Sequence, residues 1–278
     1  MQLCPPQKGV CNMKVLLFCP LNPEKDHKGK RMVQLFGKTN QSIFRQDYPK
    51  LDIWFSKGDN PFFDSNGRHN IAHNYNKARQ WVLDNDYDAL LTVEADMVIP
   101  PNAVSKMVKH ADEDNADVVY GLYCFKNTSS WSAFTELDVK HGRSLSKDKA
   151  KAREIWGQTI DVAGVGLGCT LIKRNVLEKI EFRTDETRPT MHNDWWFGID
   201  CQEHGFKQVC DTSIVCGHID LKPAIRVIWP DPDQPRLYDN EYIYGVPVND
   251  KGEVVIEIDR LGEFIIRRSD VGLPPLEA

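Results

Sequence analysis

Several features that would place this chain in a special class of protein are missing from its sequence. No apolar run approaches the roughly 20 residues that a membrane-spanning helix needs, because the run at residues 15–19 ends at Pro20. Neither sign of charge dominates, since 35 Lys and Arg stand against 40 Asp and Glu, a formal net charge of −5. This balance argues against a protein that coats nucleic acid or an anionic membrane by bulk charge. We therefore expect a cytoplasmic globular protein with no transmembrane segment.

The sequence also lacks cysteines spaced as in a metal site, and it lacks a phosphate-binding loop. The eight cysteines include no Cys-x-x-Cys pair, the spacing typical of structural zinc sites. Several lie in apolar runs, where a reduced thiol packs as a small hydrophobic side chain. Residues 20–23, after the first apolar run, hold no glycine-rich loop with a lysine. The cysteines are therefore predicted to be reduced and structural.

The sequence does contain short apolar runs that alternate with helical patterns. The predicted strands are residues 14–19, 51–55, 89–93, 117–123 and 169–173, and the predicted helices are residues 69–83 and 101–111. Strands separated by helices predict an α/β fold, with a mostly parallel sheet and helices on both of its faces. Such folds bind ligands outside the carboxyl ends of their strands, so strand ends are the first place to look for a site.

The chain divides into a main domain, residues 1–220, and a C-terminal extension, residues 221–278. The first 13 residues are predicted to be a lead-in without regular structure, because prolines and a glycine interrupt them. The extension begins with clustered prolines and is β-rich after them. Two of its runs, residues 253–258 and 263–267, predict a β-hairpin.

A polar insertion interrupts the main domain at residues 126–156, and we expect it to be a loop or a mobile helical excursion. Between residues 140 and 153 it carries six Lys and Arg against one acid. This run predicts contact with a phosphate-rich acceptor such as DNA, or else a solvated face. No aromatic residue lies in the run to stack on bases, which weakens the nucleic-acid alternative.

The most informative segment is the acidic pair that follows the run at residues 89–93. Glu94-Ala95-Asp96 comes after this run and before Pro100-Pro101, which suits a helix start. Residues two apart on an extended chain point to the same side, so both carboxylates can face one metal ion. Oxygen ligands suit Mg²⁺ or Mn²⁺ bridging a diphosphate. The alternative is a solvated strand end.

Residues 94–103 resemble the D-x-D-type motif, with its following proline, of GT-A fold nucleotide-sugar glycosyltransferases, especially the family-2-like group. Glu94 stands where that family has its first Asp. The resemblance implies a GT-A, Rossmann-like fold, Mn²⁺ or Mg²⁺ as cofactor, and a UDP- or GDP-linked sugar as donor. It makes Asp96 the firmer metal ligand and Glu94 the softer one, with Ala95 beside the nucleotide.

Two further stretches match acceptor-side features of this family. Residues 164–174 resemble its glycine-rich loop, which places Gly166 and Gly168 beside the acceptor; a tight turn is the alternative. In residues 192–197, Asp194 matches the acid that deprotonates the acceptor hydroxyl in inverting members, although Asn193 replaces the acid before it. The rival interpretation of Asp194 is a helix N-cap. Of Trp195 and Trp196, we expect one to stack on a sugar and one to fill the core.

The resemblance also implies one metal ligand far along the chain and a set of nucleotide-binding residues. His218, in a Gly-His pair behind a predicted strand, matches the histidine that completes the metal site in many such enzymes; a packed histidine is the alternative. The residues predicted to lie near the nucleotide are Pro20, Asn22, Asp59, Asn60, Arg68 and Asn74.

These matches predict a metal-dependent glycosyltransferase that moves a sugar from a nucleoside-diphosphate donor to a hydroxyl acceptor, with inversion and retention both compatible. A nucleotidyltransferase is one alternative, because an acid pair with a metal also serves attack on phosphate; the missing phosphate loop argues against it. A non-catalytic sugar- or nucleic-acid-binding module is the other, and Asn193 keeps it open. A soluble or polymeric hydroxyl acceptor is preferred.

Overall fold

The computed structural model describes residues 12–20, 22–25, 31–56, 68–126, 130–188, 191–220, 226–233, 236–239, 253–257 and 264–267. Its strands are β1 (Val15–Pro20), β2 (Asn22–Lys25), β3 (Arg31–Phe36), β4 (Leu51–Ser56), β5 (Ala89–Val93), β6 (Met97–Val98), β7 (Val118–Leu122), β8 (Ala133–Leu137), β9 (Gly142–Ser144), β10 (Thr159–Asp161), β11 (Gly164–Val165), β12 (Cys169–Lys173), β13 (Gln208–Val215), β14 (Gly217–Asp220), β15 (Arg226–Trp229), β16 (Arg236–Asp239), β17 (Glu253–Glu257) and β18 (Phe264–Arg267). Its helices are α1 (Gly37–Phe44), α2 (Arg68–Asp84), α3 (Ala103–Glu113), the 3-10 helix η1 (Leu145–Lys147), α4 (Lys149–Glu154), α5 (Arg174–Leu177) and α6 (Asn193–Glu203).

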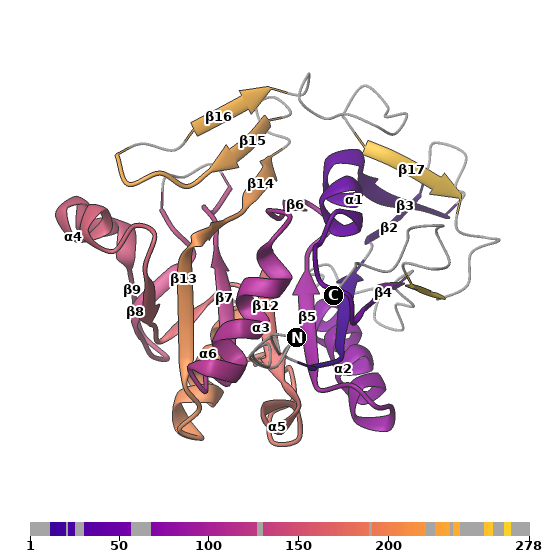
Figure 1. Ribbon diagram of the computed structural model, residues 1–278, viewed down its shortest axis with the longest axis horizontal. Coiled ribbons are helices and arrows are strands. Elements are labelled where there is room, and N and C mark those ends of the chain that lie inside the picture. The colour runs from indigo at the N-terminus through magenta and orange to yellow at the C-terminus, as the bar shows by residue number, and fades with distance from the viewer. Residues whose placement is uncertain are drawn as a thin grey trace, which may run out of the picture.

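A central eight-stranded sheet organises the molecule, in the order β10-β13-β7-β12-β5-β1-β4-β18 (Figure 1). Strand β1 pairs in parallel with β4 and β5, and β7 pairs in parallel with β13. Strand β12 runs antiparallel between β5 and β7, so β1, β4, β5, β7 and β13 all point the same way. The prediction of an α/β fold with a large, mostly parallel sheet is confirmed, and smaller antiparallel sheets surround it.

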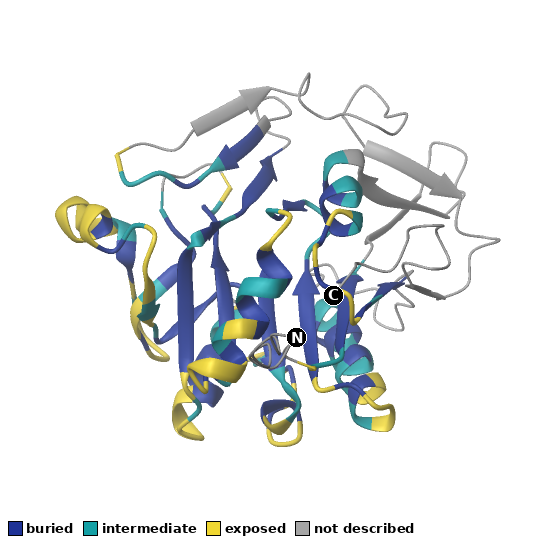
Figure 2. Cartoon of the chain, viewed as in Figure 1, coloured by how far each residue is buried: buried dark blue, intermediate teal, exposed yellow. Residues whose placement is uncertain are grey.

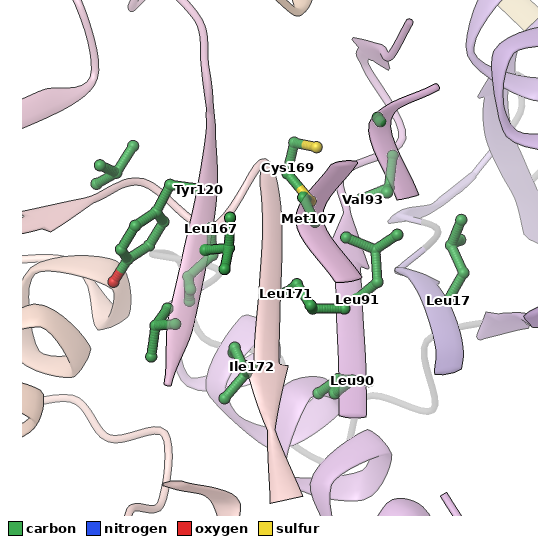
Figure 3. Packing of buried hydrophobic residues seen from close by; sticks show 14 of the residues in the cluster. Leu17, Leu90, Leu91, Val93, Met107, Tyr120, Leu167, Cys169, Leu171 and Ile172 are labelled. Carbon is green, nitrogen blue, oxygen red and sulfur yellow. The ribbon is translucent and has the colours of Figure 1, made fainter. Parts of the chain in front are cut away.

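Helices cover both faces of this sheet. Figure 1 shows α3 in front of it, where α3 contacts β7, β12 and β13, while α2 lies behind and contacts β1 and β5. Burial on two sides explains why β5 and β7 are buried along their whole length and are continuous apolar runs (Figure 2). Figure 3 shows the resulting core, in which Leu91 of β5 is the register partner of Leu171 on β12.

The predicted elements of the main domain agree closely with the structure. Strands β5 and β12 have the predicted bounds. Strand β4 differs from the prediction by one residue at one end, and β1, β7 and α2 differ by one residue at each end. Helix α3 begins at Ala103 instead of residue 101, because Ala103 N–H donates to Pro100 C=O and closes a turn first (3.0 Å). Apolar runs of this kind are local signals, which is why they predict the elements well.

The interpretation of residues 126–156 as a loop or helical excursion is corrected by the structure. Strands β8 and β9 form an antiparallel sheet with β11, and helix α4 follows. Asp148 begins α4 by accepting hydrogen bonds from the backbone N–H groups of Ala150 and Lys151. The insertion is anchored by Trp131, which is 1% exposed and lies 5.7 Å, ring to ring, from Trp156.

The prediction of a C-terminal β-hairpin is wrong. Strand β17 pairs antiparallel with β3, and β18 pairs antiparallel with β4 at the edge of the central sheet. An edge strand offers a row of unpaired backbone groups, and β18 satisfies those of β4. The division at residue 220 stays a prediction, although β18 joins the sheet of the main domain.

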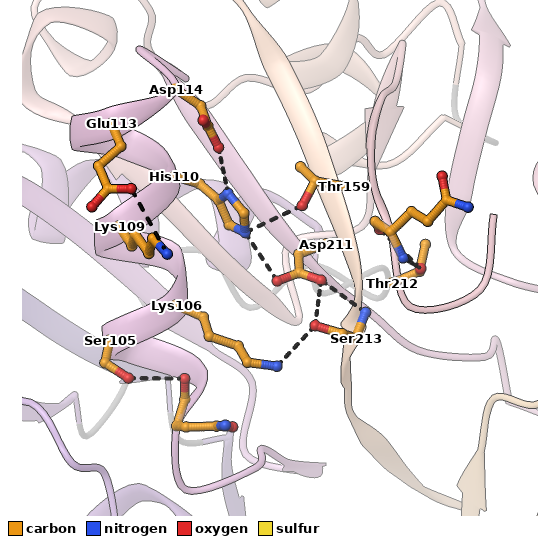
Figure 4. A network of polar contacts seen from close by, with 12 residues as sticks. Ser105, Lys106, Lys109, His110, Glu113, Asp114, Thr159, Asp211, Thr212 and Ser213 are labelled. Atoms are coloured by element: carbon orange, nitrogen blue, oxygen red, sulfur yellow. Dashed lines mark hydrogen bonds and ion pairs between the residues drawn. The ribbon is translucent and has the colours of Figure 1, made fainter.

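A network of hydrogen bonds and ion pairs joins α3 to β13, with the buried Asp211 of β13 at its centre. Asp211, which is 4% exposed, accepts from the backbone N–H and the hydroxyl of Ser213. Its other oxygen lies 3.0 Å from His110 Nε2, and Lys106 Nζ donates to the Ser213 hydroxyl (Figure 4). This network fixes α3 against β13 of the central sheet.

Arg174, at the start of α5, closes the C-terminal end of α2. Its two terminal nitrogens contact the carbonyl oxygens of Val82, Leu83, Asn85 and Tyr87 at 2.7–3.1 Å. The last carbonyls of a helix have no hydrogen-bond partner within the helix. The Arg174 guanidinium supplies these partners, and its planar set of N–H donors reaches several carbonyls at once.

We expect Arg174→Met to lower the free energy of unfolding by about 2 kcal/mol, because hydrogen bonds to a charged donor are lost together. Urea denaturation monitored by circular dichroism measures it. Arg143→Met is the control, since the Arg143–Glu136 ion pair is exposed and contributes little. Equal stability of Arg174→Met and wild type would refute a structural role for Arg174.

In the part of the chain that the structure describes, no helix is long and apolar enough to cross a membrane. The six cysteines described there, Cys19, Cys124, Cys169, Cys201, Cys210 and Cys216, are all buried and form no disulfide. Their burial agrees with the expectation that these thiols pack as small hydrophobic side chains.

Candidate metal centre

The acidic pair lies in a tight turn that leaves the carboxyl end of β5. Met97 N–H donates to Glu94 C=O (3.0 Å), and Glu94 N–H donates to Gly168 C=O (3.1 Å). The two carboxylates therefore converge because the chain turns. The prediction that they converge as alternate residues of an extended strand is wrong. Ala95 is the partly buried centre of this turn.

The turn leads directly into β6, which recruits His218 from a distant part of the sequence. Strand β6 pairs antiparallel with β14, so that His218 is the register partner of Met97. Ile219 N–H also donates to Asp96 C=O (2.8 Å), which ties the two segments together at the acidic turn. Strand pairing thus places the predicted histidine beside the predicted carboxylates.

Glu94, Asp96 and His218 form a three-residue cluster whose ligand atoms all lie within 4.8 Å of one another. His218 Nε2 is 3.7 Å from Asp96 Oδ2. The other ring nitrogen of His218, Nδ1, lies 2.8 Å from the carbonyl oxygen of Cys124. Because a carbonyl only accepts, Nδ1 carries the proton, and the neutral imidazole presents its Nε2 lone pair to the carboxylates, as in a metal-ligating histidine.

The donor set fits a divalent cation. Two carboxylates and one imidazole are ligands that Mn²⁺ accepts, and the carboxylates also suit Mg²⁺. One of these carboxylates already has a cationic neighbour, since the ammonium group of Lys126 contacts Asp96 Oδ2. His218 is 7% exposed, whereas the Asp96 side chain is 22% exposed, so the cluster is open on one side.

Burial and mutual repulsion perturb the charges of this cluster. Burial, followed by the negative charge of Asp96, raises the pKa of Glu94 to about 7. Burial acts in the same direction on Asp96, but interactions with His218 and Lys126 outweigh it and hold that pKa below its usual range. Burial lowers the pKa of His218 and Lys126, yet Asp96 outweighs it and raises both. Ionisation of Glu94 is therefore unfavourable beside Asp96, and a bound cation would reduce that cost.

Asp194 lies in the same acidic region, at the start of α6. Burial raises its pKa, and its charge in turn contributes to the raised pKa of Glu94. It is the second residue of the helix, so the N-cap position belongs to His192, whose side chain caps nothing. Asp194 Oδ1 nevertheless accepts from the backbone N–H of Trp195 (2.7 Å), which is one of the free donors at the helix start.

Gly166 and Gly168 are required by close packing against Tyr123. A methyl group on Gly166 would collide with the Tyr123 hydroxyl and lie 3.3 Å from Asp194 Oδ2. At Gly168 the same group would lie 3.0 Å from the Tyr123 ring, and Gly168 N–H donates to the Tyr123 hydroxyl (3.3 Å). Neither glycine has a positive φ. The loop thus brings its backbone close to the acidic turn and to Asp194.

The two tryptophans of α6 have different surroundings. Trp196 is 5% exposed, and the Arg183 guanidinium lies over its ring at 4.0 Å, so Trp196 belongs to the core. Trp195 is half-buried, contacts the Phe134 ring at 5.4 Å, and donates from Nε1 to the Asp138 carbonyl (2.8 Å). Of the two rings, only that of Trp195 is therefore partly exposed.

The residues predicted to bind the nucleotide are only partly placed. Pro20 ends β1, beside Ser56 at the end of β4, and Asn22 begins β2. Arg68 begins α2, while Asp59 and Asn60 lie outside the described residues. Asn74 is buried on α2, and its Oδ1 has no hydrogen-bond partner within the described part of the chain.

Sequence reasoning missed Lys126 and two tyrosines, one beside Glu94 and one beside His218. The Tyr75 hydroxyl lies 3.4 Å from Glu94 Oε1, and the Tyr123 ring packs edge-on against His218 at 5.4 Å. Lys126 follows the carboxyl end of β7, so the rule that sites lie at strand ends would have drawn attention to it. Tyr75 had no such signal, because its helical spacing predicts a core residue.

Comparisons with known proteins bear on the fold. No protein-family model matches the chain, and no curated protein matches it either. Among solved structures, the crystal structure of A197 from STIV superposes with a TM-score of 0.55 at 20% sequence identity. The match covers 85% of this chain and 99% of that one. At this identity the likeness concerns the fold alone.

Proposed function

We propose that this protein is a metal-dependent glycosyltransferase of the GT-A type, which moves a sugar from a nucleoside-diphosphate donor to a hydroxyl acceptor. One observation carries the proposal: the Glu94–Asp96–His218 cluster at the carboxyl end of β5, with Asp194 in the same acidic region. Ligands bind at this edge of α/β sheets. The motif order that resembles the family, including Glu94-Ala95-Asp96 in the place of its D-x-D motif, supports the same function.

Three residues of the cluster are proposed as the metal ligands. Asp96, Glu94 and the Nε2 atom of His218 would hold Mn²⁺ or Mg²⁺, which when bound supplies neutralising charge for the departing diphosphate. The hydrogen bond from His218 Nδ1 to the Cys124 carbonyl keeps the imidazole in the ligating tautomer. The diphosphate of the UDP- or GDP-linked donor would meet the protein here, and its base would lie toward the ends of β1 and β4.

Asp194 is proposed as the general base of an inverting reaction. A base must take the proton of the acceptor hydroxyl as the new bond forms, and a raised pKa makes a carboxylate better at this. Burial raises the pKa of Asp194 in this way. Gly166 and Trp195, which lie beside it, would form the acceptor side of the site.

The acceptor is proposed to be an uncharged hydroxyl compound rather than DNA. In the basic run at residues 140–153, Arg143 pairs with Glu136 and Arg153 pairs with Asp233. Both pairs are exposed and reduce the positive potential that a phosphate backbone would require. These contacts favour a solvated face.

Nucleotide-dependent thermal stabilisation tests the proposal. With Mn²⁺ present, we expect one of UDP, GDP, CDP and dTDP to raise the melting temperature by roughly 5 °C, because a ligand at 100 times its Kd stabilises by about 2.7 kcal/mol. EDTA should remove most of this shift.

The other outcomes decide between the alternatives. Larger stabilisation by a nucleoside triphosphate than by every diphosphate would favour a nucleotidyltransferase. No shift with any nucleotide, with or without Mn²⁺, would contradict both enzymes and leave a sugar- or nucleic-acid-binding module.

A further inference from the structure

One oxygen of Asp96 faces the nitrogen atoms of two side chains, Lys126 and His218. The Lys126 ammonium contacts Asp96 Oδ2, and His218 Nε2 lies 3.7 Å from the same oxygen. Lys126 follows β7 in the short segment that also supplies the Cys124 carbonyl to His218. An ammonium group is therefore held where the acidic cluster would hold a divalent cation.

The charges around Lys126 favour this contact in the protein without metal. Glu94, Asp96 and Asp220 all act on it, and Asp220 is only 2% exposed on β14. Of these carboxyl groups, Asp96 is the one that the Lys126 ammonium contacts. A second cation on Asp96 Oδ2 would be repelled by the ammonium that is already there.

The side chain of Lys126 has the freedom to leave. It is 42% exposed, and its flexible four-carbon stem allows the ammonium to move by several ångströms while the backbone stays in place. An ammonium is also a general partner of phosphate oxygens. Once displaced from Asp96, Lys126 would still lie at the carboxyl end of the sheet, where the diphosphate of a donor would lie.

We propose that Lys126 is an exchangeable counter-ion of this site: it neutralises Asp96 when no divalent cation is bound, and it pairs with the donor diphosphate when such a cation takes its place. The first half stands on the geometry of Asp96 and Lys126 alone. The second half rests on the glycosyltransferase proposal. Together they couple binding of the cation to binding of the diphosphate.

Two titrations of Lys126→Met, with Lys126→Arg as the charge-conserving control, test this exchange. In the first, Mn²⁺ alone is added and the free ion is followed by electron paramagnetic resonance. We expect Lys126→Met to bind Mn²⁺ about tenfold more tightly than wild type, because a repelling charge has been removed at close range. Lys126→Arg should resemble wild type.

In the second titration, inorganic pyrophosphate is added to each protein at saturating Mn²⁺ and followed by calorimetry. We expect Lys126→Met to bind pyrophosphate about tenfold more weakly than wild type, because a charged phosphate partner is lost. A purely structural role for Lys126 would not produce opposite effects on the two ligands. Melting curves in EDTA check that both variants are folded.

Each half of the proposal has an outcome that overturns it. Equal or weaker Mn²⁺ binding by Lys126→Met, or no Mn²⁺ binding by wild type, overturns the counter-ion role. Unchanged pyrophosphate affinity overturns the transfer to the diphosphate. If wild type binds neither pyrophosphate nor any nucleoside diphosphate with Mn²⁺, the glycosyltransferase proposal fails, while the Mn²⁺ titration still decides the counter-ion role.

Discussion

Asp96→Asn is expected to weaken Mn²⁺ binding by at least about 100-fold, because even partners that only orient a metal ligand contribute up to that factor. Asp96 is the residue that the other members of the site converge on: Lys126 contacts its Oδ2 atom, and His218 Nε2 lies 3.7 Å from the same atom. An amide keeps the size of this side chain but removes its charge. Calorimetric titration with Mn²⁺ measures the loss, and hydrolysis of the sugar nucleotide should disappear with it.

Glu113→Gln is the matched control for this change. Glu113 is an exposed carboxylate on α3 whose only described ion pair is with Lys109, at 3.8 Å. Its amide variant should bind Mn²⁺ like wild type. Wild-type affinity in Asp96→Asn as well would mean that the Glu94–Asp96–His218 cluster is not a metal centre, and would remove the main support for a transferase.

Asp194→Asn is expected to lower glycosyl transfer about 100- to 10,000-fold, the usual contribution of a positioned general base. Binding of Mn²⁺ and of the nucleotide should persist, because Asp194 belongs to α6 and not to the acidic turn. Initial rates at saturating donor measure the loss. Glu203→Gln, at the exposed end of the same helix, is the control and should leave the rate unchanged.

The pH dependence of the melting temperature tests whether Asp194 serves function or the stability of the fold. Burial raises the folded-state pKa of Asp194 above its unfolded value of about 3.9, so the folded protein holds this proton more tightly. Wild type therefore loses stability relative to Asp194→Asn as the pH rises from the unfolded pKa through the folded one. The variant should melt at a higher temperature than wild type at pH 8, and at the same temperature below about pH 3. A lower melting temperature of Asp194→Asn at pH 8 would indicate that Asp194 is there for the fold.

Much of the fold and part of the site could be predicted from local sequence patterns. The largely apolar run at residues 89–93 gives β5 because a strand buried on two faces consists mainly of apolar residues. The position of Glu94 and Asp96 after that strand placed them at the ligand-binding edge. The assumed reason for their convergence was wrong, since a turn closed by Met97 N–H brings them together. A turn's hydrogen bond leaves little trace in the composition of four residues.

Strand pairings between segments far apart in the chain were harder to predict from the sequence. The runs at residues 253–258 and 263–267 looked like a hairpin because they are close in sequence, yet β17 and β18 pair with β3 and β4. Any strand with an unpaired edge can accept a further strand, so the sequence of a strand does not predict which strand it pairs with. The polar insertion at residues 126–156 was likewise underestimated, since Trp131 anchors it through a contact with Trp156.

The sequence by itself determined the class of fold, the positions of the buried strands along the chain and the acidic residues that follow β5. These features depend on hydrophobic periodicity and short-range spacing. Only the tertiary structure decided that His218 lies in the same cluster as the two carboxylates, because the pairing of β6 with β14 brings it there. The structure likewise brought Lys126 onto Asp96 from the end of β7. Electrostatic partners act through space, and a distance of a few ångströms between residues far apart in the chain is set by the packing of the whole sheet.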